Sequence, residues 1–181
     1  MLHLKNITAG NPKTAEQYQL TKQYGVTWLF SEDDKNWYEE QKNFASDTIK
    51  MVYTGDGRVV WVGKDVTGIE PRNASVIEVQ DITANRRITV PGYWFYRDDK
   101  FVFDYKLKAE DERDAQLKQV SIMTSEWEKD LLLGLISDED REKLKAYRIY
   151  AKSLQTMDFS PITDKASYNA IEWPVSPEAS S

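Results

Sequence analysis

The chain of 181 residues carries 24 basic and 30 acidic side chains, one histidine and no cysteine. Its net charge of -6 argues against a broad nucleic-acid surface, which needs a basic face. The lack of cysteine excludes disulfides and thiolate sites, and His3 alone cannot build a multi-histidine metal cage. No apolar run approaches the ~18–20 residues of a membrane span, and residues 1–10 lack the apolar core of an export signal. We therefore expect a protein that is not an enzyme, needs no cofactor and does not insert into membranes.

The first part of the chain predicts an antiparallel, β-rich lobe with one short helix. Asn11-Pro12 is typical of a helix start, and Gly25 of a helix end, so a helix is predicted over 12–24. The Asp56-Gly57 pair between apolar runs predicts a hairpin. Apolar segments predict strands over 2–7, 26–30, 37–41, 49–53, 58–62 and 75–79.

A polar stretch that ends in Pro91-Gly92 predicts the domain boundary. We divide the chain into a domain of residues 1–82, a linker of residues 83–91 and a domain of residues 92–181. Arg86-Arg87 in this linker is either a solvated pair or a contact for an anionic partner.

An aromatic hairpin follows the predicted linker. Its two strands flank the turn at Asp98-Asp99, and aromatic side chains occupy both faces. Either the hairpin is covered on both sides, or one aromatic face binds a partner. The candidate partner-binding residues are Tyr93, Trp94, Phe95, Tyr96, Phe101 and Phe103, together with Trp28 and Trp37 from the first lobe.

The remaining chain predicts a helical hairpin. Apolar residues recur at helical spacing through Leu117, Val120, Trp127 and Leu131, in a helix that runs from about residue 108 to Gly134. A second helix is predicted over 138–155, with Ser137 as its N-cap. The fold class is therefore α+β, with a C-terminal lobe of aromatic β-hairpin plus helical hairpin.

The order of several segments resembles a known family. These segments include Leu2-His3-Leu4-Lys5-Asn6-Ile7, Trp28-Leu29-Phe30-Ser31-Glu32-Asp33, Asp81-Ile82-Thr83-Ala84-Asn85-Arg86-Arg87, Leu135-Ile136-Ser137-Asp138-Glu139-Asp140 and Ile171-Glu172-Trp173-Pro174. Together they resemble the tail fibre assembly proteins of lambda-like and Mu-like bacteriophages and prophages.

The resemblance implies a chaperone that binds the C-terminal tip of the receptor-binding tail fibre and promotes its folding and trimerisation. It implies action in the host bacterial cytoplasm during virion assembly, and some members remain on the fibre tip in the viral tail, where host recognition takes place. The family has no known catalytic site. Two alternatives stay open, a module that binds host lipopolysaccharide glycan and a structural subunit of the virion tip.

The fibre-binding surface is predicted on the aromatic hairpin. Folding fibres expose strand edges and apolar surface, which a partner with an aromatic β surface can cover. We expect the fibre tip to bind at the Trp94/Tyr96 face, at the Phe95/Phe101 face or at an exposed strand edge of the first lobe.

Overall fold

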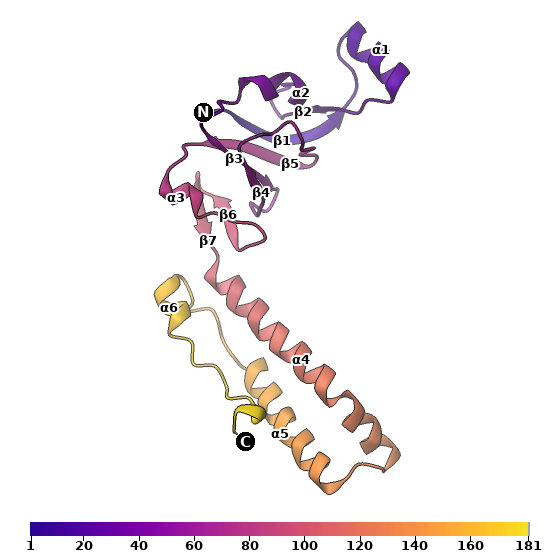
Figure 1. The fold of residues 1–181 in the computed structure, drawn as a ribbon, viewed down its shortest axis with the longest axis vertical. Helices are drawn as coiled ribbons and strands as arrows, with labels where there is room; N and C mark the ends of the chain where they lie inside the picture. The colour runs from indigo at the N-terminus through magenta and orange to yellow at the C-terminus, as the bar shows by residue number, and fades with distance from the viewer. Residues whose placement is uncertain (181) are drawn as a thin grey trace. The chain divides into compact units, whose positions relative to one another are not determined.

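The computed structural model describes residues 1–180 and divides them into two compact units, Met1–Phe103 and the helical unit that begins at Asp104. The first unit contains all seven strands and three short α-helices, and the second contains the long helices (Figure 1). The α+β class, with a β-rich N-terminal part and C-terminal helices, is confirmed.

The first unit is built on a five-stranded antiparallel sheet. Its order is β2-β1-β5-β3-β4, so the first strand lies inside the sheet. The strands are β1 (His3–Gly10), β2 (Trp28–Phe30), β3 (Ile49–Thr54), β4 (Val59–Gly63) and β5 (Ala74–Val79). In β3 the first four residues are all buried, as expected for a strand that is covered on both faces.

Two hydrophobic clusters account for this burial. On one face of the sheet, the cross-strand pair Val52 and Val76 joins a cluster with Leu4 and Trp37. The neighbouring β3 residue, Met51, belongs to a second cluster, which also contains Ile88. Trp94 packs against this second cluster. The second cluster therefore fixes the segment after β5 and the aromatic hairpin to the sheet.

The short helices differ in part from the prediction. Helix α1 (Ala15–Tyr24) begins later than predicted, because Thr14 rather than Asn11 caps it, and it ends at Gly25 as expected. The strand predicted over 37–41 is wrong. These residues form α2 (Trp37–Glu40) and a 3-10 helix (Gln41–Asn43), because the Asn36 side chain accepts a hydrogen bond from the Tyr38 N–H and caps the helix.

The domain boundary also lies elsewhere than predicted. Strands β6 (Trp94–Arg97) and β7 (Lys100–Phe103) form the aromatic hairpin, which belongs to the first unit. The segment predicted as a linker contains helix α3 (Thr83–Arg86), and Ile88 behind it is only 3% exposed. A polar sequence that ends in Pro-Gly is typical of a linker, but here Ile88 and Val90 fix the segment to the core.

The helical unit is an antiparallel pair of helices with a returning tail (Figure 1). Helix α4 (Tyr105–Leu133) ends at Gly134, whose φ of 71° closes the helix, and Ser137 caps α5 (Asp138–Gln155). The predicted end of α4 at Gly134 and the predicted start of α5 after Ser137 are both confirmed. The tail contains α6 (Lys165–Asn169) and a 3-10 helix (Pro177–Ser180), and the Tyr168 hydroxyl donates a hydrogen bond to Glu112 of α4.

Candidate functional site

The aromatic hairpin turns through two aspartates in the left-handed conformation. Asp98 and Asp99 have φ values of 50° and 58°, as a two-residue hairpin turn of the primed type requires. Aspartate tolerates this conformation better than most residues because its short side chain can bond locally. The turn sets a register in which Trp94 faces Phe103 and Tyr96 faces Phe101.

This register redistributes the predicted aromatic faces. Residues directly opposite each other in an antiparallel pair lie on the same face, so Phe101 shares a face with Tyr96 and not with Phe95. Phe95 is 3% exposed, and the Arg97 guanidinium lies 4.1 Å from its ring centre. The predicted Phe95/Phe101 face is therefore wrong. The partly exposed aromatic face contains Trp94, Tyr96, Phe101 and Phe103.

The hairpin is attached to the sheet through Gly57. The Tyr96 N–H donates a 2.7 Å hydrogen bond to the Gly57 carbonyl, and Phe95 forms a β-bridge with Arg58. The Tyr96 ring then packs 4.8 Å from Tyr53 and 5.6 Å from His3 between ring centres. The backbone approach at Gly57 thus positions the whole aromatic face.

Replacing Gly57 with alanine is expected to release the hairpin from the sheet. A Cβ atom at Gly57 would lie 2.5 Å from the Tyr96 carbonyl oxygen, and the φ of +89° disfavours any side chain. We expect the free energy of unfolding to fall by more than about 1 kcal/mol, and the amide hydrogen of Tyr96 to exchange faster. Gly55→Ala is the matched control, because nothing lies within 4 Å of its Cβ position. Equal protection of Tyr96 in the two variants would contradict this account.

A small pocket lies where the aromatic face meets the sheet and α3. We call this the hairpin pocket; its volume is about 280 Å³. Its lining combines apolar side chains with four polar ones, and consists of Ile77, Val79, Ala84, Asn85, Arg87, Ile88, Trp94, Tyr96, Asp99, Lys100 and Phe101. The structure therefore brings Trp94, Tyr96 and Phe101, three of the predicted partner-binding residues, to one concave site.

Two ionisable side chains on this face are held neutral. Burial, followed by the hydrogen bond to Asp99, raises the pKa of Tyr96 to about 12. Burial, followed by the positive charge of Lys5, lowers the pKa of His3. His3 and Tyr53 share a 2.7 Å hydrogen bond between Nε2 and the hydroxyl. At neutral pH the Tyr96 side chain and the neighbouring His3 side chain are therefore uncharged.

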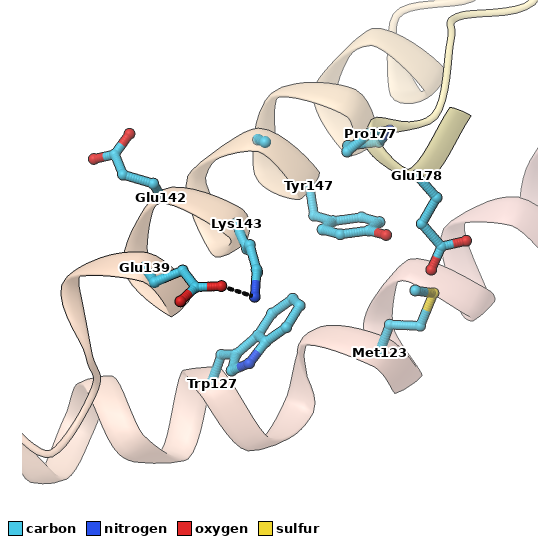
Figure 2. Close-up of a pocket in the computed structure, with 9 residues that line it drawn as sticks. Met123, Trp127, Glu139, Glu142, Lys143, Tyr147, Pro177 and Glu178 are labelled. Atoms are coloured by element: carbon cyan, nitrogen blue, oxygen red, sulfur yellow. Dashed lines mark hydrogen bonds and ion pairs between the residues drawn. The ribbon is translucent and has the colours of Figure 1, made fainter. Parts of the chain in front are cut away.

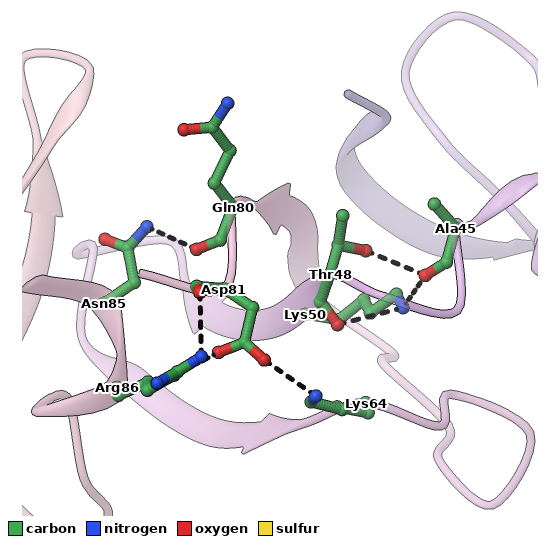
Figure 3. A network of polar contacts seen from close by, with 8 residues as sticks. All are labelled: Ala45, Thr48, Lys50, Lys64, Gln80, Asp81, Asn85 and Arg86. Atoms are coloured by element: carbon green, nitrogen blue, oxygen red, sulfur yellow. Dashed lines mark hydrogen bonds and ion pairs between the residues drawn. The ribbon is translucent and has the colours of Figure 1, made fainter. Parts of the chain in front are cut away.

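The two neighbouring arginines have different environments. The Arg86 Nε donates a 2.6 Å hydrogen bond to Asp81, whose other carboxylate oxygen lies 2.7 Å from Lys64 Nζ (Figure 3). These two hydrogen bonds lower the pKa of Asp81 to about 2. The Arg87 guanidinium lies 5.6 Å from the Trp94 ring centre, at the hairpin pocket. Arg86 therefore fixes α3, and Arg87 is the one available to a partner at the pocket.

The two tryptophans proposed from the first lobe are core residues. Trp37 is completely buried, and Trp28 is 8% exposed, with its indole N–H donating a 2.7 Å hydrogen bond to the Thr21 hydroxyl. Neither side chain offers a surface to a partner. Tyr93 is half-buried, with its ring centre 6.0 Å from that of Phe103.

A second concave surface lies in the helical unit, and the sequence pattern did not predict it. We call it the helical groove. Figure 2 shows the side chains that line it. Its volume is about 790 Å³. It is lined by Met123, Trp127, Glu139, Glu142, Lys143, Ala146, Tyr147, Pro177 and Glu178. The helical spacing predicts one apolar face on this helix but not a groove beside it, and Met123 and Trp127 on that face are only partly buried.

The turn between the two long helices carries an exposed leucine cluster. Leu131, Leu132, Leu133 and Leu135 expose 47%, 87%, 70% and 71% of their surface. The sequence indicates this exposed cluster, because four leucines surround Gly134 at a position where a turn between helices normally carries polar residues. Exposed apolar patches of this kind are typical of interaction sites.

Neither a metal site nor a membrane span emerges from residues 1–180. These residues hold no group of three or more histidine, aspartate or glutamate side chains that could bind a metal ion. None of their helices combines the length and the apolar character needed to cross a membrane.

Comparison with known proteins gives consistent matches. Residues 39–178 match the family described as "Caudovirales tail fibre assembly protein, lambda gpK". The chain is 48% identical to "Tail fiber assembly protein U'" of Escherichia phage Mu over 171 residues, which cover 90% of this chain and 97% of the relative. It is 47% identical to the protein of the same name in Escherichia phage P1, with the same coverage. It is also 42% identical to "Probable tail fiber assembly protein" of Escherichia phage P2, over 87% of this chain and 94% of that relative.

Proposed function

Because the chain belongs to the Caudovirales tail fibre assembly family and acts in phage tail fibre assembly, we propose that it binds the C-terminal tip of the fibre and promotes its folding and trimerisation. It is an assembly factor and not an enzyme. The proposed place of action is the host cytoplasm, where the fibre is synthesised.

One observation supports the choice of binding surface. The hairpin pocket joins three partly exposed aromatic side chains to Arg87 and Lys100 on a β surface. Aromatic anchors in small pockets, with polar groups around them, supply most of the binding energy at protein interfaces. A fibre chain that has not yet formed its trimer exposes apolar side chains that such a pocket accepts.

The test is co-expression with the tail fibre encoded in the same genome. The fibre is expressed alone and with this protein, and soluble trimer is measured by size-exclusion chromatography with light scattering. We expect trimer to be recovered only with the partner, and co-elution would indicate continued binding to the tip. Equal recovery of trimer without the partner would overturn the proposal.

A pair of variants then tests the hairpin pocket. Ala84→Leu places a larger side chain at the pocket, whereas Thr83→Leu changes an exposed neighbour on α3 that does not line it. We expect Ala84→Leu, like Phe101→Ala, to lower trimer recovery by about tenfold, on the scale of losing one interface anchor. Circular dichroism establishes that each variant is folded. Wild-type recovery with folded Ala84→Leu and Phe101→Ala would exclude the hairpin pocket as the fibre-binding site.

A further inference from the structure

We propose that the helical groove binds an apolar segment of the tail fibre that carries a lysine or arginine side chain. This inference rests on the proposed function and adds a second contact with the fibre, separate from the hairpin pocket. The groove lies within residues 39–178, the part of the chain that matches the family model.

The groove has an apolar floor formed by two helices. Met123 and Trp127 of α4 are one helical turn apart, and Tyr147 of α5 faces them (Figure 2). Ala146 of α5 also lines the groove. Tyr147 is 5% exposed, so its ring closes the bottom of the groove and is part of the core. A volume of about 790 Å³ is enough for several side chains of a peptide.

The apolar surface continues along α4 to the helix turn. Leu131 follows Trp127 by four residues, which places both side chains on the same side of α4. Met123, Trp127 and Leu131 thus form an apolar strip along α4 that reaches the turn, where Leu132, Leu133 and Leu135 are exposed as well. A strip of this length suits an extended or helical segment better than a small molecule.

The rim of the groove is acidic. Glu139, Glu142 and Glu178 line it, and Lys143 is its only cation among the described residues. Lys143 Nζ lies 2.6 Å from Glu139 (Figure 2). It also lies 3.7 Å from Asp140, so its charge is already balanced. A basic side chain beside the apolar segment would therefore be attracted to Glu178 and to Glu142, whose exposed ion pair with Lys145 is 3.6 Å long.

The same charges disfavour two other occupants. Residues 104–181 contain 16 acidic and 11 basic residues, a net charge of -5, so the acidic helical units of two copies would repel each other. The chain's own tail has no lysine or arginine after Lys165, and it already forms one wall of the groove through Pro177 and Glu178. A basic fibre segment remains the complementary occupant.

The test reverses charges on the rim of the full-length protein. Glu139→Lys with Glu142→Lys changes two exposed groove residues, each of which has one or more exposed ion pairs within its helix. Glu126→Lys with Asp114→Lys is the matched control, because it makes the same charge change, also breaks exposed pairs and does not touch the groove. Ala146→Leu is a third variant that fills the floor without removing a core side chain.

Affinity for the co-purified fibre is measured at two salt concentrations. We expect the Glu139→Lys, Glu142→Lys variant to bind the fibre about tenfold more weakly at low salt, which is the effect expected of reversing two charges on the rim. The control variant should bind like wild type. Ala146→Leu should also bind more weakly, but without a change in salt dependence. In a scan of overlapping fibre peptides, those bound by wild type should be apolar with a lysine or arginine.

Three results would overturn the inference. These are wild-type affinity in both groove variants, selection of acidic peptides, or a dimer of the protein alone that the groove variants dissociate. Each leaves the proposed function intact if wild type still yields trimeric fibre. Failure of wild type itself to yield trimer would instead refute the proposed function.

Discussion

Replacing Trp37 with alanine is expected to lower the unfolding free energy of the first unit by about 3–5 kcal/mol. Trp37 is completely buried in the cluster that contains Leu4 and Val76, and its ring centre lies 6.1 Å from that of Phe44. Alanine would leave a cavity the size of an indole beneath the central strands. Chemical denaturation, followed by circular dichroism, measures the loss.

Trp37→Phe is the control that separates shape from polarity. The indole Nε1 of Trp37 has no hydrogen-bond partner among residues 1–180, so phenylalanine removes some volume but also an unpaired buried donor. We expect its cost to stay below about 1.5 kcal/mol. If Trp37→Ala kept wild-type stability but lowered the recovery of soluble fibre trimer, Trp37 would be a binding residue and not a core residue.

Replacing Glu78 with alanine is expected to destabilise the first unit by about 3 kcal/mol. The buried carboxylate accepts hydrogen bonds from the Leu2 N–H at 2.9 Å and from the Ala45 N–H and Thr48 hydroxyl, both at 2.7 Å. Lys50, the residue opposite Glu78 in the sheet, is 1% exposed and donates to the carbonyls of Ala45 and Thr48 (Figure 3). Alanine would remove the acceptor for three donors and a negative charge that interacts with the buried Lys50.

The same carboxylate makes stability depend on pH. Burial favours the neutral acid, but the hydrogen bonds from Leu2, Thr48 and Ala45, with the charge of Lys50, outweigh it and lower the pKa of Glu78 below 4.5. A lowered folded-state pKa gives stability that is present above the unfolded value and is lost as the pH falls through the folded value. Wild type should therefore lose stability below about pH 4.5.

Glu78→Gln is the matched variant for this pH effect. Glutamine keeps the shape but presents an N–H₂ group to one of the donors, so it should be less stable at pH 7 and lose less stability between pH 4.5 and pH 3. Identical acid profiles for wild type and Glu78→Gln would show that Glu78 does not carry the effect.

Local signals in the sequence predicted the helical hairpin well. Gly134 and Ser137 fix the ends of α4 and α5 through backbone geometry and capping, which depend only on neighbouring residues. The strand predicted at residues 37–41 failed for the opposite reason. The apolar Trp37 fits either a strand or a buried helix, and only the three-dimensional core decides between them.

The binding surfaces were predictable only in part. The sequence identified the aromatic hairpin, but it could not reveal that the register places Phe101 beside Tyr96 and buries Phe95. The helical groove depends on the distance between two helices and on the returning tail, neither of which leaves a periodic signal in the sequence.

The position of β1 inside the sheet has a consequence for how the protein folds during synthesis. Leu4 pairs with Val76, so the strand made first waits until β5 has left the ribosome before it gains its inner neighbour. Contacts between residues so distant in sequence form slowly, whereas α4 and α5 contact each other across a short turn. At about 5–20 residues per second, the order of synthesis gives the slow unit a head start and leaves the fast-folding helices until last.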